Sequence, residues 1–124
     1  MAEIINIIKA LAQENRLRIL NLLKQQKLCV CELQNIMEEK QSNISRHLNV
    51  LKKAELIKSE KESFWIYYYL NEETINEHPF VSIILTYEIG ETDFCQSDNE
   101  RLKIYQESDL DCNDLKDSGI SPDI

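Results

Sequence analysis

The sequence predicts a mainly α-helical fold with a small β-hairpin, arranged as a homodimeric winged helix-turn-helix. Three observations lead to this fold class. Apolar residues recur at helical spacing in the first half of the chain, a three-residue connector joins two of the resulting helices, and the spacing then changes from about 3.6 toward 2. The length of 124 residues fits one domain with a tail.

The predicted helices follow one another closely. Residues 4–12 and 15–23 each place apolar side chains on one helical face. A third helix is predicted over 29–37 and a fourth over 41–54. The connector 38–40 between them has the length that a helix-turn-helix requires.

A β-hairpin is predicted directly after the fourth helix. Residues 56–59 and 64–70 are rich in β-branched and aromatic side chains, and polar residues separate them. A hairpin in this position is a wing. We expect the aromatic run to pack one face on the core and to leave the other half exposed, because recognition of a DNA duplex does not require stacking on bases.

Two helices are unusually apolar for so small a domain. One is 4–12, and the other is predicted over 79–89, where Pro79 fits the first turn. We expect these two helices to pair across a two-fold dimer interface. The pattern weakens after residue 91, where Leu102, Ile104 and Tyr105 indicate one more helix. The expected division is a winged helix-turn-helix and dimerisation domain over 1–92 and an acidic, partly flexible extension over 93–124.

Charge is distributed unevenly along the chain. The net charge is −8, yet residues 1–70 carry 11 Lys and Arg against 8 Asp and Glu, whereas residues 71–124 carry 3 against 14. Positive charge is concentrated over 40–61, with six basic and two acidic residues. This patch favours a DNA partner, although the acidity of the whole chain leaves a module that binds only protein as an alternative.

Other function classes are excluded. The chain has no apolar run long enough for a membrane span and no secretory signal at its start, so we expect a cytoplasmic protein without a membrane partner. It also has no Gly-rich phosphate loop, and neither His47 nor His78 has a paired nucleophile. An enzyme is therefore not expected.

The fourth helix carries polar side chains on the turns that would enter a major groove. Arginine can bind guanine with two hydrogen bonds, and glutamine or asparagine can bind adenine in the same way. Lysines of the helix end and the wing would contact phosphate. The candidate DNA-contacting residues are Gln41, Ser42, Asn43, Ser45, Arg46, His47, Lys52 and Lys61.

Cys29 and Cys31 stand at the start of the third helix. In a chain without an export signal, all four cysteines are expected to be reduced thiols, for which metal or redox roles are typical. Residues i and i+2 of an ideal helix point roughly 200° apart. Two such thiols can share one ion only where the first turn is loose or becomes loose, and binding would then strain the recognition helix that follows.

Together these residues resemble the ArsR/SmtB family of winged-helix metalloregulatory repressors, and in particular its arsenic-repressor type. The resemblance rests on the cysteine pair within 28–33, the recognition helix of 41–52 and the strand end at 65–68, and it covers roughly residues 5–70. It implies a homodimer that binds double-stranded operator DNA and leaves when a thiophilic ion binds the cysteines.

The third ligand is open, because Gln34 stands where arsenic sensors of this family often have a cysteine. We expect Cys95 to supply a third sulfur, with Cys112 or a site of two sulfurs as alternatives. Few sulfur ligands favour trivalent arsenic or antimony as inducer over cadmium, lead or zinc, although these remain alternatives. A thiol-redox switch, in which Cys29 and Cys31 are oxidised and bind no metal, is a further alternative function.

Three turns also depart from the family pattern. Glu38, Glu55 and the wing tip at Glu62 and Ser63 stand where relatives usually have glycine. These turns must therefore be made without the residue that adopts positive φ freely.

Overall fold

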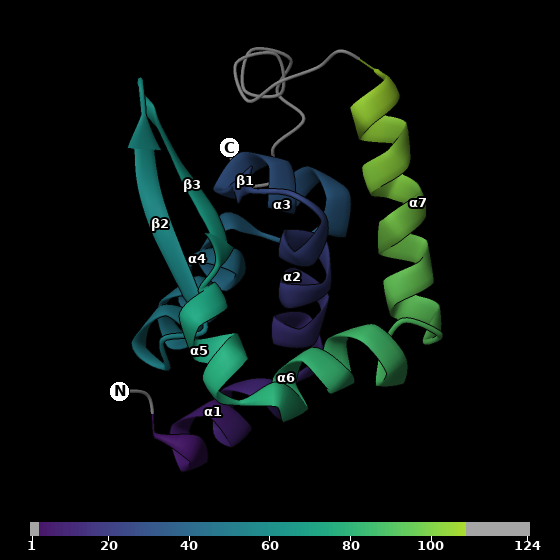
Figure 1. Ribbon diagram of the computed structural model, residues 1–124. Helices are drawn as coiled ribbons and strands as arrows, with labels where there is room; N and C mark the ends of the chain where they lie inside the picture. Colours follow the sequence, from purple (N-terminus) through teal and green to yellow (C-terminus); the bar gives the residue numbers. More distant parts are fainter. Residues whose placement is uncertain (1–2, 109–124) are drawn as a thin grey trace.

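Figure 1 shows the protein as a computed structural model, in which residues 3–108 are described. The elements, in chain order, are α1 (Ile4–Leu11), α2 (Glu14–Gln25), β1 (Leu28–Cys29), α3 (Val30–Met37), α4 (Gln41–Lys53), β2 (Ile57–Glu62), β3 (Trp65–Leu70), α5 (Glu72–Glu77), α6 (Pro79–Ile83), the π-helical segment η1 (Ile84–Glu88) and α7 (Asp93–Glu107). The predicted mainly helical fold with a small wing is confirmed. Strand β1 and helix α5 have no counterpart among the predicted elements.

Helix α2 lies at the centre of the molecule, between the wing and α7 (Figure 1). Its Ile19, Leu20 and Leu22 are fully buried, so this helix is covered nearly all round in its middle turns. Helix α4 instead buries one face, which carries Ile44 and Leu48. Its polar residues are thereby turned outward, as a recognition helix requires.

The sheet has three antiparallel strands in the order β1-β3-β2. Strands β2 and β3 form the wing, from the pair Ile57–Leu70 to the pair Glu62–Trp65 at the tip. Strand β1 lies on the other edge of β3, where Cys29 pairs with Tyr67. The backbone of one cysteine is therefore part of the wing sheet.

Within residues 3–108, three residues other than glycine have positive φ: Glu38 at 56°, Glu55 at 63° and Ser63 at 59°. They lie in the α3–α4 connector, the turn from α4 into β2 and the wing tip. These are the three turns at which glycine is expected from the family pattern, and at each of them a residue with a Cβ atom adopts positive φ.

Helix α7 packs against α2 and α3, and it occupies the first part of the expected extension 93–124. The fully buried Asp98 accepts hydrogen bonds from Nε and Nη2 of Arg18, both at 2.8 Å. Asn99 accepts two more, from Asn21 at 2.8 Å and Gln25 at 2.7 Å. These contacts fix the first half of α7 to α2.

The long apolar helix expected over 79–89 is present as α6 followed by η1. Its turns widen to π-helical geometry at Ile84. No helix within residues 3–108 combines the length and apolar character that a membrane crossing requires.

Candidate functional site

The outer face of α4 presents most of the residues expected to contact DNA. Gln41, Ser42 and Arg46 are exposed, and Asn43 and Ser45 are half-buried. The carboxylate of Glu39 accepts a hydrogen bond from Asn43 Nδ2 at 3.1 Å, and Asn43 Oδ1 accepts one from Arg46 Nη2 at 3.3 Å. A row of donors and acceptors thus lines the first two turns.

His47 does not belong to this face, which corrects the expectation that it contacts DNA. Its side chain is only 3% exposed. Its Nδ1 lies 3.3 Å from Nη1 of Arg16, whose Nε and Nη2 donate to the carbonyls of Ala10 and Lys9 at the end of α1. Burial, and then the positive charges of Arg16 and Arg46, lower the pKa of His47. The neutral imidazole therefore joins α4 to α1 and α2.

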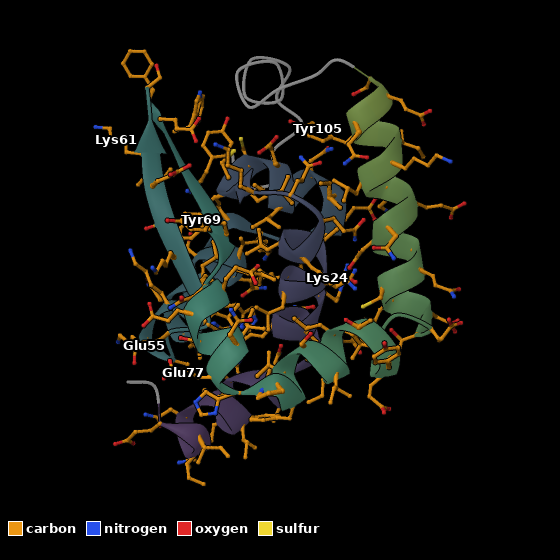
Figure 2. The ribbon with its side chains drawn as sticks, viewed as in Figure 1. Lys24, Glu55, Lys61, Tyr69, Glu77 and Tyr105 are labelled. Carbon is orange, nitrogen blue, oxygen red and sulfur yellow. The ribbon has the colours of Figure 1, made fainter. Side chains whose placement is uncertain are left out.

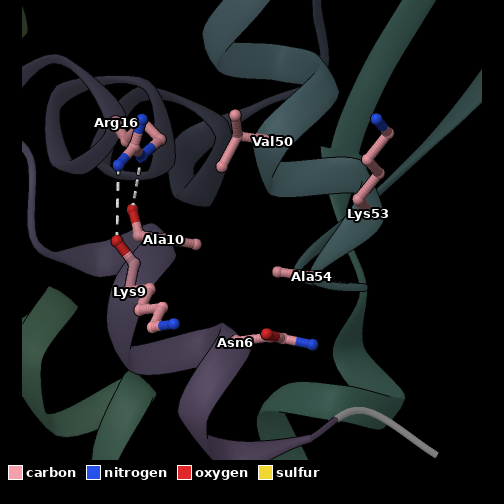
Figure 3. A pocket seen from close by; sticks show the side chains of 7 residues that line it. All are labelled: Asn6, Lys9, Ala10, Arg16, Val50, Lys53 and Ala54. Carbon is pink, nitrogen blue, oxygen red and sulfur yellow. Dashed lines mark hydrogen bonds between the residues drawn. The ribbon is translucent and has the colours of Figure 1, made fainter.

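Arg16 also lines a pocket of about 420 Å³ between α1 and α4 (Figure 3). Figure 3 shows Val50 and Ala54 on the α4 side and Asn6 on the α1 side, while the Lys53 side chain extends away from the cavity. The cationic groups of the lining do not converge on one point in this view. The arrangement gives no defined ligand site.

The wing adds positive charge next to α4. Lys52 Nζ donates to Ser59 Oγ at 2.8 Å, which connects the end of α4 to β2. Lys61 is exposed near the wing tip (Figure 2). Lys27 forms ion pairs with Glu60, at 3.1 Å, and with Glu62. Sequence reasoning missed Lys27, which offsets the two acidic groups of the wing.

The cysteine pair has a geometry that a regular helix would forbid. Cys29 is the residue before the first turn of α3, and its backbone is extended, with φ −95° and ψ 173°. The rule of roughly 100° per residue does not apply to a residue outside the helix. The sulfur atoms of Cys29 and Cys31 consequently lie 3.3 Å apart. The pair converges because Cys29 lies before the first helical turn, so this turn does not have to loosen further to bring the sulfur atoms together.

Glu32 is a further residue of this site that the sequence analysis did not single out. Its Oε1 accepts a hydrogen bond from the backbone amide of Cys29 at 2.9 Å, and its Oε2 accepts one from the hydroxyl of Tyr105. Glu32 and Cys29 form a capping box in which cysteine takes the usual place of serine or threonine. The spacing of three residues between Cys29 and Glu32, typical of a capping box, could have identified Glu32 from the sequence.

Cys95 is not brought to the cysteine pair within the chain. It is fully buried in the first turn of α7, and burial raises the pKa of its thiol. Tyr105 lies ten residues further along α7, a rise of about 15 Å. Cys112 lies outside the described residues. Within residues 3–108, no group of three or more His, Cys, Asp or Glu side chains is placed to hold a metal ion.

Comparisons with known proteins agree with this geometry. The model of the arsR family of bacterial regulatory proteins matches residues 13–59. An uncharacterised HTH-type transcriptional regulator of Methanocaldococcus jannaschii is 40% identical over 72 residues, which are 57% of this chain and 81% of that protein.

Two further relatives carry names that refer to metals. The arsenical resistance operon repressor of Bacillus subtilis is 46% identical over 69 residues, which are 55% of this chain and 66% of that protein. The cadmium resistance regulatory protein CadC of Listeria innocua is 40% identical over 63 residues, covering 50% of this chain and 53% of that protein. The chain thus spans about half to two thirds of these two relatives.

Among solved structures, HlyU from Vibrio cholerae superposes with a TM-score of 0.57 at 32% identity, covering 66% of this chain and 89% of that chain. The family match covers α2, α3, α4 and the first residues of β2, and the two relatives are each covered over more than four fifths of their own length. This chain therefore belongs to the ArsR family of bacterial transcriptional regulators, which act by binding DNA and are not enzymes.

Proposed function

We propose that the protein is a repressor that binds operator DNA as a homodimer and is released when trivalent arsenic or antimony binds Cys29 and Cys31. The observation that carries this proposal is the 3.3 Å contact between the two sulfur atoms at the start of the helix-turn-helix. Strand pairing of Cys29 with Tyr67 links the same position to the wing. A ligand of the pair therefore acts next to both parts that contact DNA.

In the proposed complex, α4 enters the major groove. Gln41, Ser42, Asn43, Ser45 and Arg46 read base edges, while Lys52 and Lys61 contact phosphate. His47 has no part in this contact because it is buried.

The dimer is supported by apolar side chains that a monomer leaves in solvent. On α1 these are Ile4, Ile5 and Ile8, and on the α6–η1 segment they include Ile83 and Tyr87, which is 74% exposed. Both elements lie together at one end of the molecule (Figure 1). A two-fold axis at this end would cover both faces and space two recognition helices on one duplex.

Two sulfurs that converge suit an ion that is satisfied by few ligands. Trivalent arsenic and antimony accept three sulfurs, whereas zinc and cadmium usually take four ligands. Cadmium, lead or zinc remains the alternative inducer, because one relative is named for arsenical resistance and another for cadmium resistance.

For the third sulfur, the described geometry favours Cys112 over Cys95. Tyr105 contacts Glu32, so the end of α7 lies beside the pair, and Cys112 follows Glu107 by five residues. Five residues can span up to roughly 16 Å. Cys95 would instead have to leave its buried position at the opposite end of α7.

The test is arsenite-induced release from the operator, measured by fluorescence anisotropy. Cys29→Ser and Cys31→Ser should bind operator like the wild type and should no longer be released, because the ion lowers DNA affinity only through its own binding. Release of either variant at wild-type arsenite concentrations would refute the proposal.

The third ligand is tested by the sulfur count from X-ray absorption. Cys112→Ser should lower it from three to two, and the matched control Cys95→Ser should leave it at three. The reverse pattern would assign the third sulfur to Cys95.

A thiol-redox switch is the second candidate function, favoured by the same sulfur contact. Oxidation would join Cys29 and Cys31 in place of ion binding. Release by peroxide without arsenite, reversed by a thiol reductant, would identify this alternative.

A further inference from the structure

Glu32 is buried between the cysteine pair and α7, and both of its carboxylate oxygens are occupied. One oxygen accepts a hydrogen bond from the Cys29 amide, and the other accepts a hydrogen bond from the Tyr105 hydroxyl. Hydrogen bonds to a charged group are stronger than neutral ones, and they hold a buried side chain in one orientation. Glu32 therefore has little freedom to move independently of Cys29 or Tyr105.

The hydrogen bond to Cys29 fixes the geometry that brings the sulfurs together. Cys29 and Cys31 converge only because the Cys29 backbone is extended. The Glu32 carboxylate holds the Cys29 amide in this conformation from the first turn of α3. If the Glu32 carboxylate moved away, Cys29 could adopt helical backbone angles. The side chains of Cys29 and Cys31 would then point in different directions.

The hydrogen bond from Tyr105 makes this geometry depend on α7. Tyr105 is buried in the last turns of that helix, and Figure 2 shows it beside α3. In the first half of the helix, Asp98 holds α7 on α2 through Arg18. Helix α7 is thus fixed in its first half, and its C-terminal part contacts Glu32, the residue that holds Cys29 in place.

We propose that Tyr105 is a positioning residue of the thiol site: through Glu32 it couples the docking of α7 to the distance between the sulfurs of Cys29 and Cys31. The coupling regulates the site on which the proposed function rests. By reciprocity, a ligand that bridges the two sulfurs favours the docked state of α7.

The test compares a probe that needs both sulfurs with one that needs a single sulfur. Phenylarsine oxide forms two As–S bonds with two thiols and releases one water, whereas iodoacetamide alkylates one thiolate and releases iodide. Tyr105→Phe, which removes only the hydroxyl, should weaken phenylarsine oxide binding about tenfold, the scale of one hydrogen bond to a charged group. The alkylation rate at Cys29 and Cys31 should change less than about twofold because no thiol is lost.

Tyr69→Phe is the matched control, because Tyr69 is a half-buried residue of β3 that lies outside the thiol site and outside the proposed dimer face. It should leave both reactions unchanged. Equal binding of phenylarsine oxide by Tyr105→Phe and the wild type, or an equal loss in both reactions, would overturn the inference.

Glu32→Gln provides a second variant. It keeps an oxygen that can accept the hydrogen bond from the Cys29 amide and removes the negative charge. In the Glu32→Gln background, the further change Tyr105→Phe should lower phenylarsine oxide binding by less than it does in the wild type, because both changes act through the same side chain. An equal loss in both backgrounds would exclude a role for Glu32.

These measurements use no DNA, so their outcome is separable from that of the proposed function. A wild-type protein that binds phenylarsine oxide but keeps its operator in arsenite would refute the repressor proposal alone. Intact arsenite release with identical arsenical binding in Tyr105→Phe would refute the coupling alone.

Discussion

Glu55 offers a direct measure of backbone strain in this fold. It has a φ of 63° in the turn that connects α4 to β2, and its side chain is exposed. The turn is held by backbone groups: the Glu55 amide donates to the Lys52 carbonyl, and the Glu55 carbonyl accepts from the Asn71 side chain, both at 3.0 Å. Glycine keeps these hydrogen bonds, so Glu55→Gly changes the conformational cost and little else.

The size of the effect follows from two opposing terms. The left-handed conformation costs a residue with a Cβ atom about 1–2 kcal/mol, and glycine removes this cost. Glycine also adds about 0.4–1 kcal/mol of unfolded-state entropy that folding must overcome. The expected net gain in the free energy of unfolding is about 0.5–1 kcal/mol, or a rise in Tm of roughly 2–5 °C.

Urea and thermal denaturation of three proteins would test this reasoning. Glu55→Ala is the matched control, because it removes the same charge and keeps the Cβ atom. We expect Glu55→Gly to be the most stable of the three. A glycine variant no more stable than the alanine variant would show that the turn is not strained at this residue.

Two further predictions concern α4. Arg46→Ala and Gln41→Ala should each weaken specific operator binding by about 1–3 kcal/mol without dissociating the dimer, as measured by anisotropy and sedimentation; wild-type affinity in both would show that this helix does not read the operator. His47 has a pKa below its ordinary 6.5, so the unfolded chain binds its proton more readily. Its stabilising effect should be complete above about pH 6.5 and decrease as the pH falls toward the folded-state pKa. Urea titrations from pH 7 to 5 should show the free energy of unfolding decreasing with pH, and His47→Gln should lack this decrease. An identical decrease in the variant would assign it to other titratable groups.

The helix-turn-helix and wing could be predicted because local patterns determine them. Apolar spacing marks α1 to α4, and the change of period marks the hairpin. The two-residue strand β1 is too short for such a pattern, and it exists only because β3 pairs with it. The apolar run of 79–89 predicts a helix, but nothing in its spacing indicates π-helical turns.

The candidate site was predictable in part. His47 was assigned to the DNA face by its residue type, whereas its spacing from Ile44 and Leu51 places it on the buried face. The positions of Cys95 and Tyr105 depend on how α7 packs, which sequence periodicity does not specify. The contact between Tyr105 and Glu32 joins residues separated by 73 positions, beyond the reach of any local pattern.

Because Cys29 pairs with Tyr67, a rotation of β1 at the proposed sensing residue would rotate the wing as well. From Tyr67 to Ser63 the hairpin extends about 13 Å, at roughly 3.3 Å per residue. A rotation of about 5° at β1 therefore moves the tip by about 1 Å. Hydrogen bonds to phosphate tolerate only about half an ångström of variation in length. In the proposed complex, a change at the sulfur atoms too small to disturb the core would thus be large enough, at Lys61, to break the proposed contact with phosphate.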